Sequence, residues 1–239
     1  GGLSLGLEQA GFTPILVNEL NKDAMDTYLV NRKEYPWLQE HHYYDVKELL
    51  KDTRSAPKHF RKKFKVLEKK FNISFKGGDL DLLVGGPPCQ GFSGIGHRRN
   101  YSVDRNMIPS NTLYEDMATL ITRFLPKIFL FENVRGLTWA KWTSNGKKGE
   151  IWEDVKNTFS GTKQGFASLK KYKVENALVF AKDYGIPQNR PRVFIVGIRK
   201  DYLLEKNISP KGDVANGLLP EPSLMERAPD IIDLLGDLV

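Results

Sequence analysis

The single cysteine of this 239-residue chain stands in a setting that suits a reactive thiol. Cys89 follows the apolar run Leu82–Val84, two glycines and two prolines. Glycines let a ligand or a neighbouring backbone approach closely, and consecutive prolines stiffen the exit from a strand. A cysteine with a purely structural role is the alternative, although such residues more often lie inside a strand or a helix. The setting favours a nucleophile, which needs a neighbouring group that takes up its proton.

Two polar residues, Glu132 and Asn133, come directly after a second apolar run at 127–131. Burial disfavours the charged form of a carboxyl group, so Glu132 is suited to act as a general acid. A glutamate that caps a helix or forms a salt bridge is the alternative. Asn133 can orient its neighbours through hydrogen bonds.

Two arginines stand at the start of a third apolar run. Arg190 and Arg192 are separated by one residue, and alternate residues of an extended segment point to the same side. Together they could bind an anion or polarise a carbonyl group. A pair of surface arginines at the edge of a sheet is the alternative.

These side chains need a scaffold, and the apolar periodicity predicts one in which helices and strands alternate. Helices are predicted at 1–12, 21–32, 111–124 and 150–170, and strands at 13–18, 43–44, 81–86, 127–131, 175–181 and 192–199. Gly11 is the predicted end of the first helix, and Asn21 the predicted N-cap of the second. After Asp201 the pattern predicts loops.

The lysine-rich segment 51–76 is predicted to be helical as well. Phe60, Phe64, Leu67 and Phe71 recur there at helical spacing. This spacing favours an amphipathic helix with solvated lysines over a dedicated DNA-binding arm.

The order of the elements predicts an α/β fold with a doubly wound, mostly parallel sheet. Ligands of such sheets bind outside the carboxyl ends of the strands. Glu19, Asp45, Cys89 and Glu132 are all expected at such ends. A carboxylate in the position of Glu19 would bind ribose hydroxyls in a nucleotide-binding fold.

Composition narrows the class of protein. The formal net charge of +7 favours a polyanionic partner such as nucleic acid, although mildly basic proteins are common. A single cysteine excludes an internal disulfide and points to a reducing, intracellular setting. One cysteine and four histidines argue against a structural zinc site, and no apolar run reaches the roughly 18 residues of a membrane span.

Taken together, four segments resemble the cytosine-C5 DNA methyltransferases. Residues 85–93, GGPPCQGFS, are similar to the nucleophile loop of that family. Residues 131–134, FENV, and 188–192, QNRPR, are similar to its Glu-Asn-Val and Gln-x-Arg-x-Arg elements. Residues 1–12, GGLSLGLEQAGF, resemble the end of its first cofactor motif. The resemblance implies a Rossmann-like, S-adenosylmethionine-dependent catalytic domain at 1–205.

The resemblance also implies a mechanism on a cytosine that is flipped out of double-stranded DNA. Cys89 would add to carbon 6, Glu132 would donate to ring nitrogen 3, and Arg192 would bind the carbonyl oxygen. Supporting roles are implied for Arg190, Gln90 and Asn133. Carbon 5 would then take the methyl group, leaving S-adenosylhomocysteine, and no metal is implied.

Further residues are carried over from the same resemblance. The cofactor is expected to contact Gly1, Gly2, Glu19, Leu20, Asp45, Val46, Gly86, Pro88 and Leu113. Residues 94–112 are expected to close over the flipped base, with a plain basic loop as the alternative. DNA contacts are expected from Ser93, His97, Arg98, Arg99, Arg105 and Gln188.

The sequence departs from the family pattern in three places. The first strand and the aromatic residue of the first cofactor motif are expected before Gly1. Leu20 stands where a tryptophan is usual, which predicts weaker adenine stacking. Residues 206–239 are expected to link into a target-recognition domain that a longer chain or a second polypeptide would supply. Alone, the chain is expected to methylate specific sites weakly or not at all.

Three other interpretations are weighed against this one. A tRNA cytosine methyltransferase usually carries a Cys-Phe-Thr signature, which is absent here. A non-catalytic DNA-binding relative would have little reason to keep five residues together, namely Cys89, Glu132, Gln188, Arg190 and Arg192. A cysteine hydrolase could use His97 as its base but would leave the FENV and QNRPR segments unexplained. A cytoplasmic bacterial enzyme at the nucleoid is expected, or a nuclear one if the source is eukaryotic.

Overall fold

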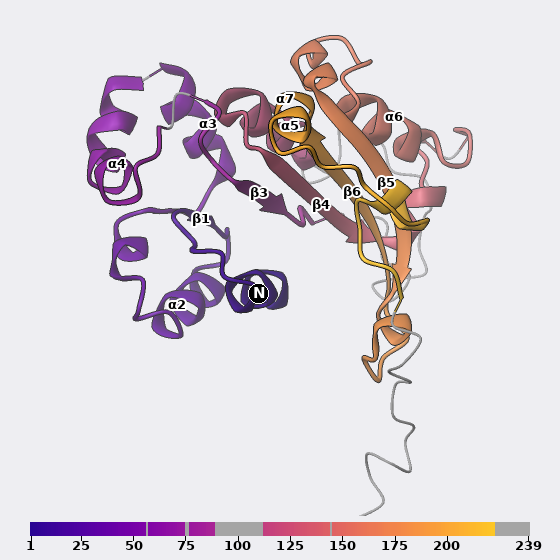
Figure 1. Cartoon of the computed structure of the whole chain (residues 1–239), viewed down its shortest axis with the longest axis horizontal. Coiled ribbons are helices and arrows are strands. Elements are labelled where there is room, and N and C mark those ends of the chain that lie inside the picture. Colours follow the sequence, from indigo (N-terminus) through magenta and orange to yellow (C-terminus); the bar gives the residue numbers. More distant parts are fainter. Residues whose placement is uncertain (56, 75–76, 89–111, 144, 223–239) are drawn as a thin grey trace, which may run out of the picture. The chain divides into compact units, whose positions relative to one another are not determined.

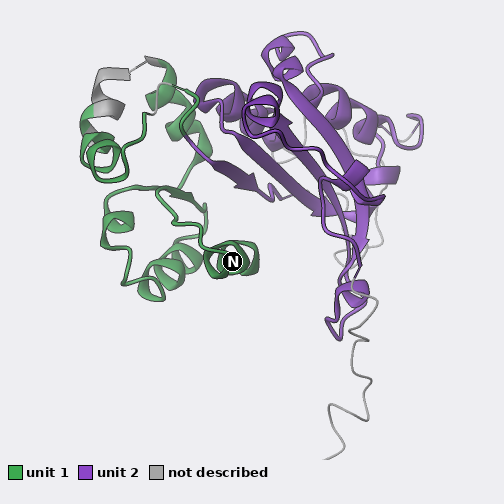
Figure 2. Ribbon diagram, in the orientation of Figure 1, with its two compact units in different colours: residues 1–79 green, residues 80–239 purple. Residues whose placement is uncertain are grey.

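The computed structural model describes residues 1–55, 57–74, 77–88, 112–143 and 145–222, and the chain divides into two compact units (Figures 1 and 2). Unit 1 is Gly1–Asp79 and unit 2 is Leu80–Val239. The predicted nucleophile, one predicted supporting catalytic residue and several predicted DNA contacts lie outside the described residues. They are Cys89, Gln90, Ser93, His97, Arg98, Arg99 and Arg105.

Unit 1 combines two short parallel strands with helices. Its described elements are α1 (Gly2–Gln9), β1 (Val17–Asn18), α2 (Lys22–Val30), the 3-10 helix η1 (Pro36–Gln39), β2 (His42–Tyr43), α3 (Val46–Ser55) and α4 (Pro57–Phe71). Val17 pairs with His42, and Asn18 pairs with Tyr43. The strand predicted at 13–18 is therefore reduced to its last two residues.

The predicted helix ends in unit 1 are confirmed. Asn21 precedes α2, and its side-chain oxygen accepts a hydrogen bond from the Ala24 amide at 2.9 Å. Gly11 follows α1 with a φ of +91°, a conformation that residues with a side chain rarely adopt. An ion pair of 2.8 Å between Arg32 and Glu8 then holds the two helices together.

The lysine-rich segment forms two helices where the sequence predicts one. α3 ends at Ser55, and α4 begins at Pro57. Proline has no amide hydrogen and restricts the residue before it, so it fits the first turn of a new helix better than the interior of a continuous one. The predicted apolar side is confirmed, because Phe64 and Leu67 are 0% and 1% exposed.

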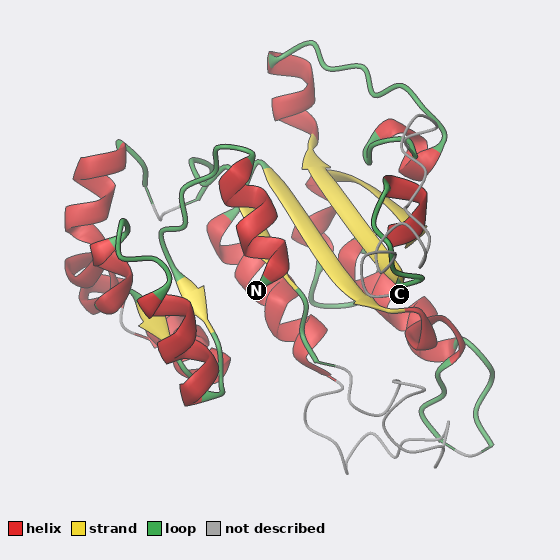
Figure 3. Ribbon diagram, turned by 90° about the horizontal axis from the view of Figure 1, so that it is seen from below, coloured by secondary structure: helices red, strands yellow, loops and turns green. Residues whose placement is uncertain are grey.

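Unit 2 is built on a four-stranded sheet (Figure 3). Its strands are β3 (Leu82–Gly85), β4 (Ile128–Val134), β5 (Tyr172–Phe180) and β6 (Pro191–Arg199), in the order β3-β4-β6-β5. β3 is parallel to β4, whereas β6 is antiparallel to both β4 and β5. Three strands therefore point one way, and the predicted α/β fold with a mostly parallel sheet is confirmed.

One face of this sheet packs against α5 (Leu113–Phe124) and α6 (Glu150–Phe159). Phe129 and Phe131 are fully buried, and their ring centroids lie 5.5 and 5.0 Å from that of Phe159. The Phe129 ring also lies against Gly197 on β6, where any side chain would collide with it. These aromatic contacts form the core beneath the strand that carries Glu132.

Two predictions about helices in unit 2 are wrong. α6 ends at Phe159 instead of continuing to residue 170, because Gly161 takes a φ of +76° that ends the helix. α7 (Lys200–Glu205) follows β6 where loops are predicted. The remaining elements are the 3-10 helices η4 (Arg135–Trp139), η5 (Ala167–Lys171), η6 (Ala181–Tyr184) and η7 (Val214–Gly217). No helix in the described ranges combines the length and apolar character needed to cross a bilayer.

Candidate active site

Glu132 and Arg192 meet on neighbouring strands of unit 2. Glu132 pairs with Phe194, and Val134 pairs with Arg192, so the register places the two charged residues on the same face of the sheet. The Arg192 Nε atom lies 2.8 Å from Glu132 Oε1, and the side chains are 18% and 25% exposed. The sequence predicts Glu132 after its strand, but β4 includes it because β6 pairs with β4 as far as Val134.

The ion pair changes the electrostatic setting expected for Glu132. The partly buried carboxyl group of Glu132 faces a guanidinium at 2.8 Å instead of an apolar environment. Arg192 also donates from Nη1 to the Pro191 carbonyl oxygen at 2.8 Å, which fixes the direction of the guanidinium. The predicted acid and the predicted carbonyl-binding cation are thus each other's partners in the structure.

Gly85 and Gly86 permit close approach on opposite sides of the β3 exit. A Cβ atom on Gly86 would lie 3.0 Å from Glu132 Oε2, which is tighter than ordinary side-chain contacts. A Cβ atom on Gly85 would lie 2.9 Å from the Met117 sulfur on α5. The double glycine therefore lets the backbone that leads to Cys89 pass directly against the Glu132 carboxylate.

Asn133 also contacts the segment that follows β3. Its side chain is 3% exposed and donates from Nδ2 to the Pro87 carbonyl oxygen at 3.0 Å. Its Oδ1 atom accepts the Val134 amide at 2.8 Å. The orienting role predicted for Asn133 thus has a geometric basis, because this side chain is hydrogen-bonded to Pro87, two residues before Cys89.

Two predicted residues are not brought to this pair. Gln188 and Arg190 lie in the exposed segment before β6. The Arg190 amide donates to the Gln188 carbonyl oxygen at 2.9 Å, and Ala181 donates to the Arg190 carbonyl oxygen at 3.2 Å. β6 begins only at Pro191, so Arg190 and Arg192 do not share a strand face as predicted.

Unit 1 supplies its own group of predicted cofactor contacts. Because β1 and β2 are parallel, Glu19 and Asp45 both follow the same edge of this small sheet. One oxygen of Glu19 accepts the Asn21 amide at 2.9 Å, and Asp45 accepts the Lys47 amide at 2.8 Å. Leu20, between these groups in the sequence, is 75% exposed.

The other predicted cofactor contacts lie at the ends of elements. Gly1 caps α1, Gly2 is its first residue, and Val46 begins α3. Leu113 begins α5, and Pro88 is the last described residue after β3.

A charged cluster that the sequence did not predict holds the start of α5. Lys163 lies 2.8 Å from Glu115 and 2.7 Å from Asp154, and the Tyr114 hydroxyl donates to Asp154 at 2.5 Å. These residues are far apart in the sequence and follow no local pattern. In the described ranges no group of three or more His, Cys, Asp or Glu residues is placed to hold a metal ion.

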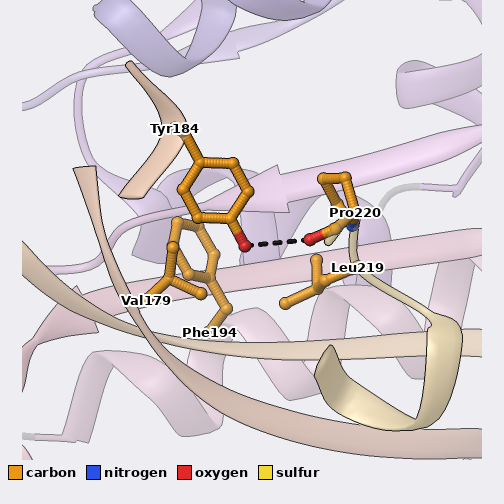
Figure 4. A pocket seen from close by; sticks show the side chains of 5 residues that line it. All are labelled: Val179, Tyr184, Phe194, Leu219 and Pro220. Atoms are coloured by element: carbon orange, nitrogen blue, oxygen red, sulfur yellow. Dashed lines mark hydrogen bonds between the residues drawn. The ribbon is translucent and has the colours of Figure 1, made fainter. Parts of the chain in front are cut away.

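An apolar pocket lies on the Glu132 face of the sheet, between β5, β6 and the segment after η7. It is lined by Val179, Tyr184, Phe194, Leu219 and Pro220 (Figure 4). The Tyr184 hydroxyl donates to the Pro220 carbonyl oxygen at 2.8 Å, and burial raises the pKa of Tyr184. The tyrosine therefore anchors this segment. None of the residues that line the pocket is charged, in contrast to Glu132 and Arg192 on the same face.

The chain is similar to known DNA methyltransferases over almost its whole length. The C-5 cytosine-specific DNA methylase family model matches residues 1–237. Type II methyltransferase M.DdeI of Desulfomicrobium norvegicum is 32% identical over 208 residues, which cover 87% of this chain and 40% of that protein. Type II methyltransferase M.AgeI of Thalassovita gelatinovora is 29% identical over 238 residues, which cover 97% and 46%.

A solved structure shows the same fold. A DNA modification methyltransferase encoded within a prophage of Escherichia coli matches 98% of this chain and 51% of its own chain, with a TM-score of 0.59 and 26% identity. The chain thus spans about half, or less, of the length of these relatives. By its match over residues 1–237, the chain belongs to the C-5 cytosine-specific DNA methylase family.

Proposed function

We propose that this chain is the catalytic part of a DNA (cytosine-5-)-methyltransferase. The observation that carries the proposal is the ion pair of Glu132 and Arg192, against which Gly86 brings the strand exit that leads to Cys89. Addition of a thiolate to a pyrimidine ring needs an acid for the ring nitrogen and a cation for the carbonyl oxygen. Membership of the family identifies the ring as cytosine.

The reaction starts with a cytosine outside the base stack, because its ring atoms are unreachable within the duplex. The Cys89 thiolate adds to carbon 6, and the proton of Glu132 passes to ring nitrogen 3 as that nitrogen gains electron density. Arg192 binds the carbonyl oxygen. Carbon 5 then accepts the methyl group. Transfer of the carbon-5 proton to a water molecule, release of the Cys89 thiolate and return of the proton from nitrogen 3 to Glu132 restore the ring.

The base would replace Glu132 as the partner of Arg192. In the structure the Arg192 guanidinium lies 2.8 Å from the Glu132 carboxyl group. A cytosine carbonyl oxygen bound by the guanidinium would leave that carboxyl group free to face ring nitrogen 3, to which it donates as the general acid.

S-adenosylmethionine would supply the methyl group, which is electrophilic because it is bonded to a sulfonium sulfur. The residues of unit 1 fit such a ligand, since the Glu19 carboxylate is anchored by the amide of Asn21, the N-cap of α2, and the exposed Leu20 offers an apolar surface for a base. Asp45 and Val46 follow the neighbouring strand.

The partner that we assign is double-stranded DNA. The relatives described above are named type II methyltransferases of bacteria. We therefore place the enzyme in the bacterial cytoplasm, where the DNA of the nucleoid is its substrate.

Duplex DNA that carries 5-fluorocytosine tests the proposal, because fluorine at carbon 5 cannot leave as a proton does and the covalent adduct is trapped. Placing the modified base opposite an abasic site lowers the unpairing energy that flipping requires. With S-adenosylmethionine present, we expect one chain attached to one DNA strand, together with one transferred methyl group. Peptide mapping should locate the attachment at Cys89.

Cys89→Ala is the matched control and should give no adduct. The proposal fails if the folded wild-type chain, supplied with the target-recognition segment that completes it, forms no adduct, or if the adduct survives the substitution of Cys89. Because one turnover suffices for detection, a slow reaction does not obscure the result.

A further inference from the structure

The net positive charge of the chain is concentrated in one short segment of unit 1. Residues 51–76 contain ten lysines and arginines and only two acidic residues. The other 213 residues contain 26 basic and 27 acidic residues. The rest of the chain is therefore close to neutral, and this segment alone accounts for the basic character of the protein.

Within α4 the charged and apolar residues lie on opposite sides of the helix. Phe64 and Leu67 are three residues apart and buried. Lys62, Lys65 and Lys69 are spaced by three and four residues and are all exposed. Lys62 and Lys65 precede the buried pair by two residues, which corresponds to about 200° around an α-helix. We call Lys62, Lys65 and Lys69 the lysine row.

Ring contacts fix the orientation of α4 within unit 1. The rings of Phe64 and His41 lie 4.7 Å apart, and those of Phe71 and Trp37 lie 5.3 Å apart. Lys70 has a packing role, because its ammonium group lies 3.8 Å from the centre of the Trp37 ring. The lysine row takes no part in these contacts, and the packing of the opposite side keeps it directed toward solvent.

The lysine row gathers like charge on one exposed side of α4. Within the part of unit 1 that the structure describes, none of its three ammonium groups is paired with a carboxylate. The spacings of three and four residues are those at which like charges repel on a helix surface. Solubility alone would be served by mixed charges, so a like-charged row in a chain that is otherwise close to neutral indicates a function.

We propose that the lysine row binds the phosphate backbone of DNA as an accessory contact, separate from the residues that act on the target base. The proposal rests on DNA being the substrate of the proposed function. Lysine contacts with phosphates are independent of base sequence, and they allow a protein to slide along a duplex. The row would hold the enzyme on DNA while the target base is sought.

Salt-dependent binding to a duplex of arbitrary sequence tests this proposal. The anisotropy of a fluorescent duplex of roughly 20 base pairs is titrated with the chain, without S-adenosylmethionine, between about 50 and 200 mM salt. The variant combines Lys62→Gln, Lys65→Gln and Lys69→Gln. We expect the slope of log affinity against log salt to fall by about two to three, and the affinity at about 0.1 M salt to fall at least about tenfold.

Two control variants separate this role from general charge and from folding. Lys33→Gln, Lys147→Gln and Lys171→Gln together remove the same charge from exposed, scattered positions and should change the affinity less than about threefold. Arginine at all three positions of the row should keep the wild-type slope, because the charge is retained. The melting temperature of the glutamine variant should stay level or rise, because repulsion within α4 is removed.

The proposal is overturned if the folded glutamine variant binds with the wild-type slope and affinity, or if the scattered control loses as much. The binding assay needs neither the cofactor nor Cys89. A negative result in the binding assay would not alter the expectation of a covalent adduct. Absence of the adduct would not alter the expected salt dependence of binding.

Discussion

The Glu132–Arg192 pair in unit 2 and the lysine row in unit 1 arrange charge in opposite ways. The pair joins unlike charges 2.8 Å apart on adjacent strands, with both side chains largely covered. The row places like charges on one helix face in solvent. Shielded, paired charges act strongly over a short distance, whereas exposed like charges act over roughly a Debye length. The pair therefore suits the chemistry on a base that we propose for it, and the row suits the proposed sequence-independent attraction to DNA.

The largest expected effect comes from Glu132→Gln, which removes the acid from the pair. Glutamine cannot donate the required proton, so the rate of methyl transfer should fall by about a hundredfold to ten-thousandfold. Single-turnover transfer of labelled methyl groups to DNA measures this rate. Glu153→Gln is the matched control, because Glu153 pairs with Lys156 on the surface, and its rate should stay near wild type.

The same Glu132 variant should bind duplex DNA with the wild-type salt dependence, since the lysine row is intact. A variant that retains more than about a tenth of the wild-type rate would falsify the general-acid role.

Phe64→Ala tests the lysine row indirectly, because it removes packing that holds α4 in place. Phe64 is fully buried, and loss of its ring should lower the free energy of unfolding by about 3–5 kcal/mol. We expect DNA affinity to weaken with it, although no lysine changes, because α4 loses its orientation. Urea denaturation and anisotropy measure the two effects.

Val66→Ala on the same helix is the control for Phe64. Val66 is 71% exposed, so this variant should lie within about 0.5 kcal/mol of wild type. If Phe64→Ala loses the stability but keeps the full affinity, the orientation of α4 does not matter for binding.

Gly86→Ala and Gly85→Ala test the surroundings of the Glu132–Arg192 pair, and their expected effects are smaller. A methyl group on Gly86 would press on the Glu132 carboxylate, so we expect the rate of methyl transfer to fall about tenfold with little change in stability. A methyl group on Gly85 would press on Met117, so we expect a loss of about 1–2 kcal/mol in stability with a nearly normal rate. Equal losses of rate in both variants would show that the two sides of the β3 exit are not distinct.

Lys65→Glu gives the smallest effect and tests the repulsion within the row. The new carboxylate would lie at attractive spacings from Lys62 and Lys69 and at a repulsive spacing from Glu68. With two attractive pairs against one repulsive pair, the free energy of unfolding should rise by about 0.2–0.5 kcal/mol, while DNA affinity falls. Chemical denaturation checks the sign, and a loss of stability would mean that the like charges do not oppose the fold.

Local signals were sufficient for most elements. The Asn21 cap, the end of α1 at Gly11 and the apolar side of α4 each depend on residues within a few turns, and all three are confirmed. Predictions failed where partners distant in the sequence decide the outcome. Strand β4 extends through Glu132 because β6 pairs with it, and nothing in the run at 127–131 reveals that partner.

The residues of the candidate site also divide into those that local sequence signals reveal and those that depend on distant partners. Glu132, Asn133 and Arg192 could be proposed from residue type and from their place beside apolar runs. The cluster of Glu115, Asp154 and Lys163 could not, because its members come from separate elements and form no motif.

The sequence by itself determined the fold class and the set of reactive groups, because periodicity and residue chemistry are local properties. Only the tertiary structure decided which arginine meets Glu132. The antiparallel register places Arg192 opposite Val134 on the glutamate's face of the sheet, while Arg190 remains in the exposed segment before β6. It also decided the two uses of the double glycine, since only packing shows that Gly86 borders Glu132 and Gly85 borders Met117.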